Sequence, residues 1–331
     1  MNSVSSRSSD KTLAYVALGI VYVVWGSTYV GIRLVIAHMP PFVAASMRFL
    51  MAGGSLLVYT LIRGRWRRPS RTQWLNAGIV GILLMGIGNG LIMSSQRYIP
   101  SGTTALMVAT FPLWLTLAEA LLSRGASLKT PVVSGVLVGL LGVVLIASSK
   151  VDVSFVGQST PIGALIAVQA ASICWTIGYL WAKSLKQRLP VIMSSGLEMV
   201  FGGLLLLAQS IAFREDWSRV ARAPMSAWAG VAFLTVFGSI IGFTAFSYTR
   251  HSLPSHVVGT YAYVNPLVAV IFGWLFFGET LSGRTVLGGA LILAAVFVTT
   301  IPGATPPAEA SQAEDMQDDP ASIGTSGKGG E

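Results

Sequence analysis

The sequence predicts an all-α integral membrane protein with ten transmembrane helices, arranged as an inverted 5+5 repeat. Three observations lead to this prediction: an apolar composition, ten long apolar runs, and two halves that align with each other. The 331 residues are 53% hydrophobic and only 11% charged, with a mean hydropathy of +0.68. A soluble domain carries about 25% charged residues. The composition therefore excludes a soluble enzyme, a disordered protein and a secreted disulfide scaffold.

Ten apolar runs follow one another with short polar gaps between them. A spanning helix needs about 20 mostly apolar residues, and helices satisfy their own backbone in lipid. Strands of an outer-membrane barrel alternate over roughly 10 residues, whereas these runs are continuous. The second run contains Arg48 and the seventh contains Glu198. The runs cover about residues 13–35, 42–62, 74–95, 101–122, 131–148, 161–182, 191–213, 227–248, 255–277 and 285–301.

The ends of the chain differ from the runs. The first run continues without a small-residue cleavage site, so we expect a retained helix rather than a signal peptide. The last residues are rich in Pro, Gly, Ser and acidic side chains, which predicts disorder. The expected parts are a cytoplasmic N-terminal tail at 1–11, five-helix repeats at 12–149 and 160–301, and a disordered cytoplasmic tail at 302–331.

Basic residues in the gaps predict the orientation. With the N-terminus inside, fourteen of the 22 Lys and Arg residues lie in inner segments, Arg250 among them, and six lie in outer gaps. Arg33 and Arg48 lie within helices. Inner loops of membrane proteins carry an excess of Lys and Arg, so we expect both termini in the cytoplasm and a place in the cytoplasmic (inner) membrane. The net charge of +9 is thus interpreted as topology, with no nucleic-acid partner.

The two halves align first at an offset of 150 residues and later at an offset of 154. Five helices per half is an odd number, so the second half must enter the membrane from the opposite side. Secondary transporters have this architecture, with the substrate site near the midplane between the repeats. The aligned pairs are Trp25/Trp175, Tyr29/Tyr179, Arg33/Lys183, Pro40/Pro190, Gly53/Gly203, Gly88/Gly242, Pro100/Pro254 and Pro112/Pro266.

Four motifs stand in these helices: VVWGSTYVGIR, PPFVAASMRFLMAG, IPSGTTALMVATFPLW and SYTRHSLPSHVVGTYAYVNPLVAVIFGWLFFGETLS. Together they resemble the EamA family of the drug/metabolite transporter superfamily, most of all the YedA-type inner-membrane transporters. The resemblance implies ten helices, both termini in the cytoplasm, and export of small metabolites or amino acids. One departure concerns the family's Gly-Glu-x-Leu, which the second repeat has at residues 278–281. The first repeat has Ala126 where the family often has Glu.

Aromatic and uncharged polar residues are the candidates for a substrate site. Such a site has mostly apolar walls with a few fixed hydrogen-bonding groups. For the tryptophans the alternative is anchoring at the membrane surface, although Trp25 and Trp175 fall near mid-helix. The candidate substrate-binding residues are Trp25, Tyr29, Asn89, Gln96, Phe111, Trp114, Trp175, Tyr179, Tyr263 and Asn265.

Ionisable residues inside a membrane are costly and usually face a cavity or a partner. Arg48, Glu119, Glu198 and His256 are therefore candidates for coupling or gating. The alternative is that Arg48 and Glu198 extend to opposite surfaces and that Glu119 caps a helix or forms a salt bridge. Direct pairing of Arg48 with Glu198 is not expected, because their depths differ by roughly 10 Å.

Pro112 and Pro266 are equivalent in the two repeats and should interrupt the backbone hydrogen bonds of the fourth and ninth helices. We expect them to be hinges, with static kinks as the alternative.

The function predicted from these features is a secondary transporter that exports small metabolites such as amino acids by alternating access. A drug or other organic-solute exporter of the same fold is the alternative, although the first helix has no carboxylate for a cation. An intramembrane enzyme is disfavoured, because it needs paired acids, a Ser–His arrangement or a metal within the bilayer. The expected partners are a small-molecule solute and the bilayer, for a monomer or homodimer. No cofactor and no metal site are expected.

Overall fold

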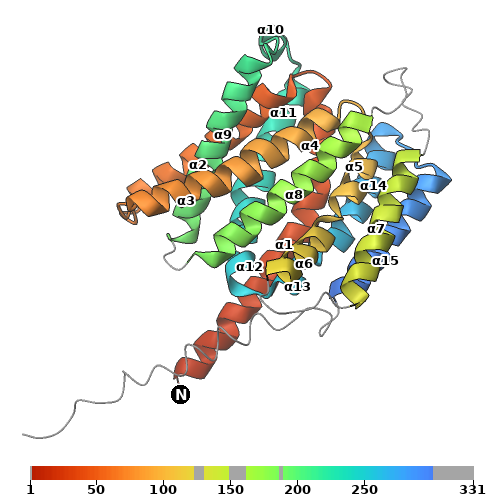
Figure 1. Cartoon of the computed structure of the whole chain (residues 1–331). Helices are drawn as coiled ribbons and strands as arrows, with labels where there is room; N and C mark the ends of the chain where they lie inside the picture. Colours follow the sequence, from red (N-terminus) through yellow and green to blue (C-terminus); the bar gives the residue numbers. More distant parts are fainter. Residues whose placement is uncertain (1, 123–129, 149–161, 186–188, 301–331) are drawn as a thin grey trace, which may run out of the picture.

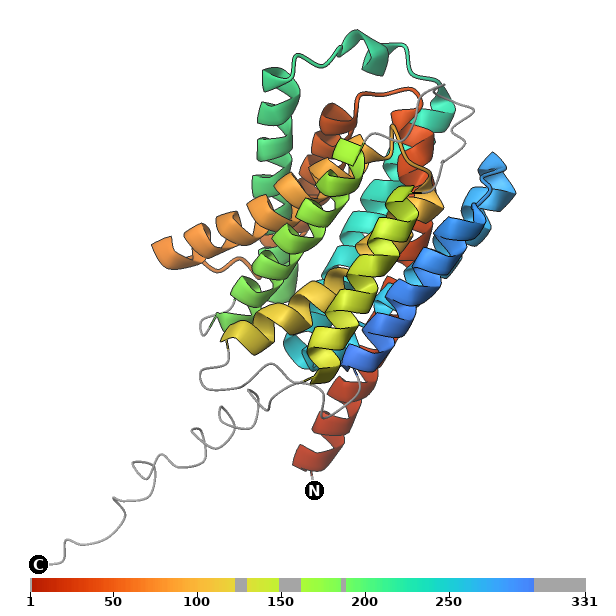
Figure 2. The same ribbon diagram turned by 45° about the vertical axis from the view of Figure 1, so that its right-hand side comes forward.

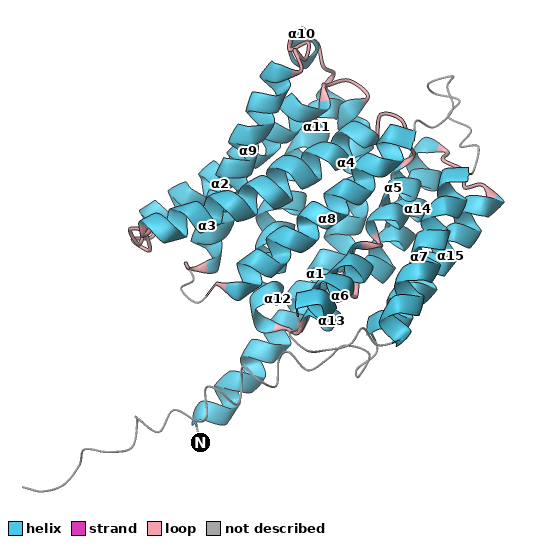
Figure 3. Ribbon diagram, in the orientation of Figure 1, coloured by secondary structure: helices cyan, strands magenta, loops and turns pink. Residues whose placement is uncertain are grey.

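The computed structural model describes residues 2–122, 130–148, 162–185 and 189–300, and the regular elements of this part of the chain are helices (Figure 3). Seven helices in it are long and apolar enough to cross a membrane: Thr12–Ile36, Pro41–Ile62, Arg71–Ser95, Ser101–Leu122, Ile162–Ser184, Val191–Ala212 and Met225–Ser252. Three shorter apolar helices lie at Val133–Ile146, Val264–Phe277 and Gly283–Val298. The predicted all-helical membrane fold is confirmed. The predicted tail at 302–331 and Ala126 lie outside the described residues.

The elements follow the predicted runs closely. In chain order they are α1 (Asn2–Ile36), α2 (Pro41–Ile62), α3 (Arg71–Gly81), η1 (Ile82–Asn89), α4 (Gly90–Ser95), α5 (Ser101–Val108), α6 (Phe111–Leu122), α7 (Thr130–Ser148), α8 (Ile162–Ser184), α9 (Val191–Ala212), α10 (Ser218–Ala221), α11 (Met225–Phe233), η2 (Leu234–Ile241), α12 (Gly242–Ser252), α13 (Ser255–Val258), α14 (Tyr261–Phe277) and α15 (Gly283–Thr300).

Helix pairs from the two repeats form the bundle (Figure 1). The second helix of each repeat, α2 or α9, packs on the other, and α1 runs between α12 and α14. The last helices, α7 and α15, lie side by side at one edge (Figure 2). Each of these pairs joins one repeat to the other, as an inverted repeat requires.

Glycines bring α2 and α9 into backbone contact. A Cβ atom added to Gly53 of α2 would lie 2.7 Å from the carbonyl oxygen of Gly196 on α9. A Cβ atom on Gly203 of α9 would lie 3.1 Å from the backbone nitrogen of Leu50 on α2. Gly53 and Gly203 are equivalent in the two repeats, so the crossing itself is close to symmetric.

The third helix of each repeat is not a uniform α-helix. η1 and η2 are eight-residue π-helical segments that lie between α3 and α4 and between α11 and α12. The sequence analysis expected uninterrupted helices here and missed both segments. π-Helical turns within α-helices occur frequently at functional sites. η1 and η2 are therefore candidate parts of a functional site.

The fourth span of each repeat is broken, at different positions. In the first repeat α5 ends at Val108 and α6 begins at Phe111, so Pro112 lies in the first turn of α6. In the second repeat α13 ends at Val258, and Pro266 lies inside α14. Pro112 thus lies near the middle of the span Ser101–Leu122, and the chain turns at residues 109–110, just before the proline.

Candidate functional site

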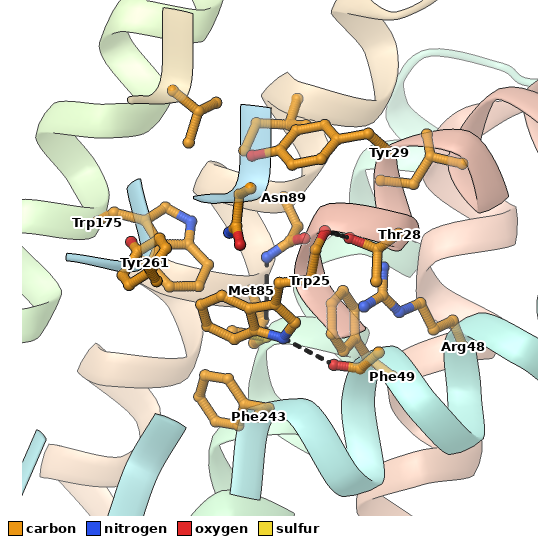
Figure 4. A pocket seen from close by; sticks show the side chains of 15 residues that line it. Trp25, Thr28, Tyr29, Arg48, Phe49, Met85, Asn89, Trp175, Phe243 and Tyr261 are labelled. Atoms are coloured by element: carbon orange, nitrogen blue, oxygen red, sulfur yellow. Dashed lines mark hydrogen bonds between the residues drawn. The ribbon is translucent and has the colours of Figure 1, made fainter. Parts of the chain in front are cut away.

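A pocket with a cavity volume of about 60 Å³ lies where the two repeats meet (Figure 4). This pocket is smaller than pockets that hold small ligands, which occupy roughly 300–1,000 Å³. Its wall is formed by parts of α1, α2, η1, α4, α5, α8, η2, α12 and α14. Of the ten predicted substrate-binding residues, the pocket is lined by Trp25, Tyr29, Asn89, Trp175 and Asn265.

Trp25 and Trp175, which are equivalent in the two repeats, meet in this pocket. Their rings lie edge to face, with centroids 5.4 Å apart and planes at 89°. Aromatic pairs prefer this arrangement because the positive edge of one ring faces the negative face of the other. The contact marks the place where the pseudo-two-fold axis crosses the bundle.

Two equivalent glycines make room for these rings. A Cβ atom on Gly242 would lie 2.6 Å from the indole nitrogen of Trp25, and a Cβ atom on Gly88 would overlap the indole of Trp175. Each tryptophan therefore packs against a glycine of the opposite repeat. The glycines at 88 and 242, which the sequence aligns in the two repeats, allow this close approach.

The π-helical segments supply polar groups to the pocket. The indole nitrogen of Trp25 donates a hydrogen bond to the carbonyl oxygen of Gly238 in η2, at 3.1 Å. The amide of Asn89 in η1 donates to the carbonyl oxygen of Leu84, also at 3.1 Å. Side chains thus bond to carbonyl groups of both π-helical segments, and this fixes the position of Trp25 and Asn89 in the wall.

Arg48 was predicted for coupling or gating, and the structure places it in the pocket wall. Its side chain is 4% exposed, and its Nε donates to the hydroxyl of Ser239, at 2.7 Å. The guanidinium carbon lies 4.7 Å from the centroid of the Phe49 ring. Arg48 is directed toward the pocket beside Thr28 in Figure 4. It does not extend to a membrane surface, which was the alternative.

Glu198 pairs with Arg250. The Nη2 of Arg250 lies 2.7 Å and 2.9 Å from the two carboxylate oxygens, and the two residues are 4% and 1% exposed. The sequence analysis placed Arg250 in an inner gap, and this was wrong, because α12 continues to Ser252 and carries Arg250 into the bundle. The pair lines a second cleft, between α3, α8, α9 and α12.

The remaining predicted residues lie outside the pocket wall. The side chains of Phe111 and Tyr179 pack against each other, with ring centroids 5.9 Å apart. Trp114 donates to Gln169 of α8, at 3.1 Å. Gln96 is fully buried at the end of α4, and Glu119 is half-buried on α6. The side chains of His256 and Tyr263 lie outside the described residues.

Charged groups close one end of the bundle. Glu279 follows α14 and accepts hydrogen bonds from the nitrogen and the hydroxyl of Ser101, at 3.1 Å and 2.7 Å. Arg33 lies 3.8 Å from the same carboxylate and donates to the carbonyl oxygen of Gln96. Carboxylates are stabilising at helix N-termini, where backbone N–H groups are unpaired. The sequence signal for this contact was the Gly-Glu-x-Leu at residues 278–281.

At the opposite end of the bundle the equivalent contact uses different groups. Lys183, the counterpart of Arg33, donates to the hydroxyl of Ser255, the counterpart of Ser101, at 2.6 Å. The counterpart of Glu279 is Ala126. Each end therefore holds a basic side chain, and the two basic side chains contact different groups.

An inverted repeat that encloses a pocket at its two-fold axis defines the class of secondary transporters. The chain matches the EamA-like transporter family over residues 12–148 and 162–301, and it belongs to that family. It is accordingly a multi-pass inner-membrane transporter and not an enzyme. The resemblance found in the sequence is confirmed.

Several relatives are similar along most of their length. The "Uncharacterized inner membrane transporter YedA" of Escherichia coli (strain K12) is 37% identical over 270 residues, which cover 80% of this chain and 83% of the relative. The "Uncharacterized transporter YvbV" of Bacillus subtilis (strain 168) is 25% identical, covering 83% and 88%. A solved structure titled "Crystal structure of protein" shares the fold, with a TM-score of 0.59, 21% identity and coverage of 89% of this chain and 98% of that one.

Proposed function

We propose that the protein exports small metabolites such as amino acids across the cytoplasmic membrane by alternating access. The observation that supports this most directly is the central pocket, which both repeats build around Trp25 and Trp175. Its wall is aromatic with a few polar groups, which is typical of sites for small organic molecules. No Asp or Glu stands among the described residues that line it, which disfavours a cationic drug as substrate.

We propose both termini on the cytoplasmic side, with repeats at 12–149 and 160–301 between the tails at 1–11 and 302–331. Moving Arg250 from the gaps into a helix leaves thirteen basic residues against six, so the charge bias still supports this orientation. Gly139 and Gly142 of α7 pack within the chain, against Leu113 and Gly288, and this supports a monomer over a homodimer.

Coupling and gating are proposed for the ionisable residues. Arg48 faces the pocket, and the Glu198–Arg250 pair borders the second cleft. A proton-driven cycle would use Glu198, Glu119 or His256, because a coupling group must titrate and be exposed to each side in turn. Glu198 would release Arg250 when it takes up a proton, which would open the second cleft.

Flux measurements in proteoliposomes test the proposed function. Vesicles loaded with a metabolite extract are assayed by mass spectrometry for solutes that leave only when the protein is present. Trp25→Ala and Trp175→Ala should each lower the flux at least tenfold, because each removes a wall of the pocket. Trp74→Ala is the matched control, since Trp74 is 40% exposed on α3 and lies outside the pocket. Absence of any protein-dependent flux would overturn the proposal.

A further inference from the structure

Arg48 is a buried cation that the surrounding protein does not neutralise. No carboxylate lies within 4.0 Å of its guanidinium in the described residues, and its Nη1 is buried without a hydrogen-bond partner there. Its Nε is bonded to the neutral hydroxyl of Ser239. An unpaired charge away from water is costly unless a partner compensates it. The free Nη1 and the pocket that Arg48 lines show where such a partner would sit (Figure 4).

The Glu198–Arg250 pair shows how this chain treats a buried charge that has no ligand. Its guanidinium group is held by two carboxylate oxygens within 2.9 Å. Nε and Nη1 of Arg250 also lack a hydrogen-bond partner among the described groups, so Arg48 differs from Arg250 in that no carboxylate of the described residues contacts it.

We infer that the central pocket recognises its substrate by a carboxylate group, which binds to the guanidinium of Arg48. A guanidinium donates charge-assisted, often paired hydrogen bonds to a carboxylate. Asn265, on the α14 side of the wall, has a buried Oδ1 without a hydrogen-bond partner among the described groups. This oxygen accepts a hydrogen bond from a donor on the same substrate. The substrate class is therefore a small metabolite with a carboxylate and a donor group, within the proposed transport function.

The test measures binding to the purified full-length protein in detergent by the shift of its thermal unfolding temperature, since a ligand that binds the folded state stabilises it. The probes form three sets that differ in whether they carry a carboxylate and an amino group. Leucine and phenylalanine carry both groups, 4-methylpentanoate and 3-phenylpropionate carry only the carboxylate, and leucinamide and phenethylamine carry no carboxylate. We expect binding by the first two sets and none by the third.

Arg48→Gln should weaken binding of the carboxylates roughly 10- to 100-fold, as expected for loss of hydrogen bonds to a charged group. Arg48→Lys keeps the charge without the paired donors. Its affinity for the carboxylates should lie between the affinities of Arg48→Gln and the wild type. Arg68→Gln removes the same charge from an exposed loop position and should bind as the wild type does. A folded Arg48→Lys protein keeps the test valid if Arg48→Gln does not fold.

Two outcomes overturn the inference. In one, leucinamide and phenethylamine bind the wild type as well as the acids do. In the other, the Arg48 variants bind the acids with unchanged affinity. If protein-dependent flux of other metabolites persists in vesicles, the proposed transport function stands and only the role of Arg48 fails. If no solute is transported at all, the proposed function fails as well.

Discussion

Positions 48 and 198 are equivalent in the two repeats, but the structure surrounds their buried charges differently. Glu198 of α9 is neutralised by Arg250 of α12, within the second repeat. Arg48 of α2 reaches across to Ser239 of η2 and opens onto the central pocket. The counterpart of Arg250 at the offset of 154 is Gln96, an uncharged side chain. The backbone frame is thus shared, while the chemistry at this position has diverged.

The same divergence appears in the shape of the cavities. Ten of the fifteen residues that line the central pocket belong to the first repeat and five to the second. Tyr29 lines the pocket, whereas its counterpart Tyr179 is buried against Phe111. The second cleft, in contrast, is lined mostly by the second repeat and holds the Glu198–Arg250 pair. The first repeat therefore contributes most of the central pocket, and the second repeat contributes most of the second cleft.

The largest effect is expected at the ion pair. Glu198→Gln should lower the free energy of unfolding by about 3–5 kcal/mol, because it leaves the charge of Arg250 buried and unpaired. Arg48→Gln should cost far less, since Arg48 has no carboxylate to leave behind. Thermal unfolding of the purified variants in detergent gives both values. The double variant Glu198→Gln/Arg250→Gln should recover part of the loss, and equal losses at 48 and 198 would contradict the comparison.

The second prediction concerns the glycines under the central tryptophans. Gly88→Ala and Gly242→Ala insert a methyl group against Trp175 and Trp25, and overpacking of this kind costs about 1–3 kcal/mol. Both variants should also displace an indole and lower the flux in vesicles. Gly54→Ala is the matched control, because a Cβ atom there would meet no other atom within 4 Å. Normal flux in both variants would mean that the tryptophan pair does not shape the pocket.

The third prediction concerns a cap from the second repeat. Glu279→Ala removes the acceptor for Ser101 at the start of α5, and loss of a helix cap costs about 0.5–2 kcal/mol. Because Arg33 loses its carboxylate as well, we expect this end of the bundle to open more often. Accessibility of a single cysteine at position 103, which is buried on α5, to a polar maleimide in a Cys174→Ser background should rise. A matched variant at the opposite end, Ser255→Ala, should leave that accessibility unchanged.

The spans and the inverted repeat could be predicted from the sequence. Half of the ten predicted substrate-binding residues line the pocket. Trp25, Trp175 and Asn265 were recognisable as candidates because a large aromatic or an amide side chain in the middle of a spanning helix is typical of a cavity wall. The faces of the helices were harder to predict, because helices that are apolar all round carry little amphipathic signal. Gln96, Phe111 and Trp114 do not line the pocket: Trp114 donates to Gln169, and Phe111 stacks on Tyr261 of the wall.

Other features depend on contacts between residues far apart in the chain. The pairing of Arg250 with Glu198 joins residues 52 positions apart, and the wall position of Arg48 depends on η2, which lies in the other repeat. The π-helical segments have no sequence rule beyond their glycines. Local pattern therefore predicted the elements well and the charge environment poorly.

The smallest effect is expected at the prolines, and it separates the two repeats once more. Pro266 lies inside α14, where a proline removes one backbone hydrogen bond and clashes with the carbonyl group of Ala262. Pro112 lies in the first turn of α6, where its missing N–H group would be unpaired in any case. We therefore propose a hinge at Pro266 and, in the first repeat, at residues 109–110 just before Pro112.

Pro266→Ala should stiffen α14 and slow the flux several-fold, with substrate affinity and unfolding temperature nearly unchanged, because neighbouring groups in a membrane already compensate the lost bond. Pro112→Ala should transport at close to the wild-type rate, since the turn before it remains. Initial rates of efflux over a range of solute concentrations separate the rate from the affinity. Equal slowing by both variants would restore the symmetric pair of proline hinges that the sequence predicts. Wild-type rates in both would make Pro266 a static kink, because a hinge that limits the conformational change must slow transport when it is stiffened.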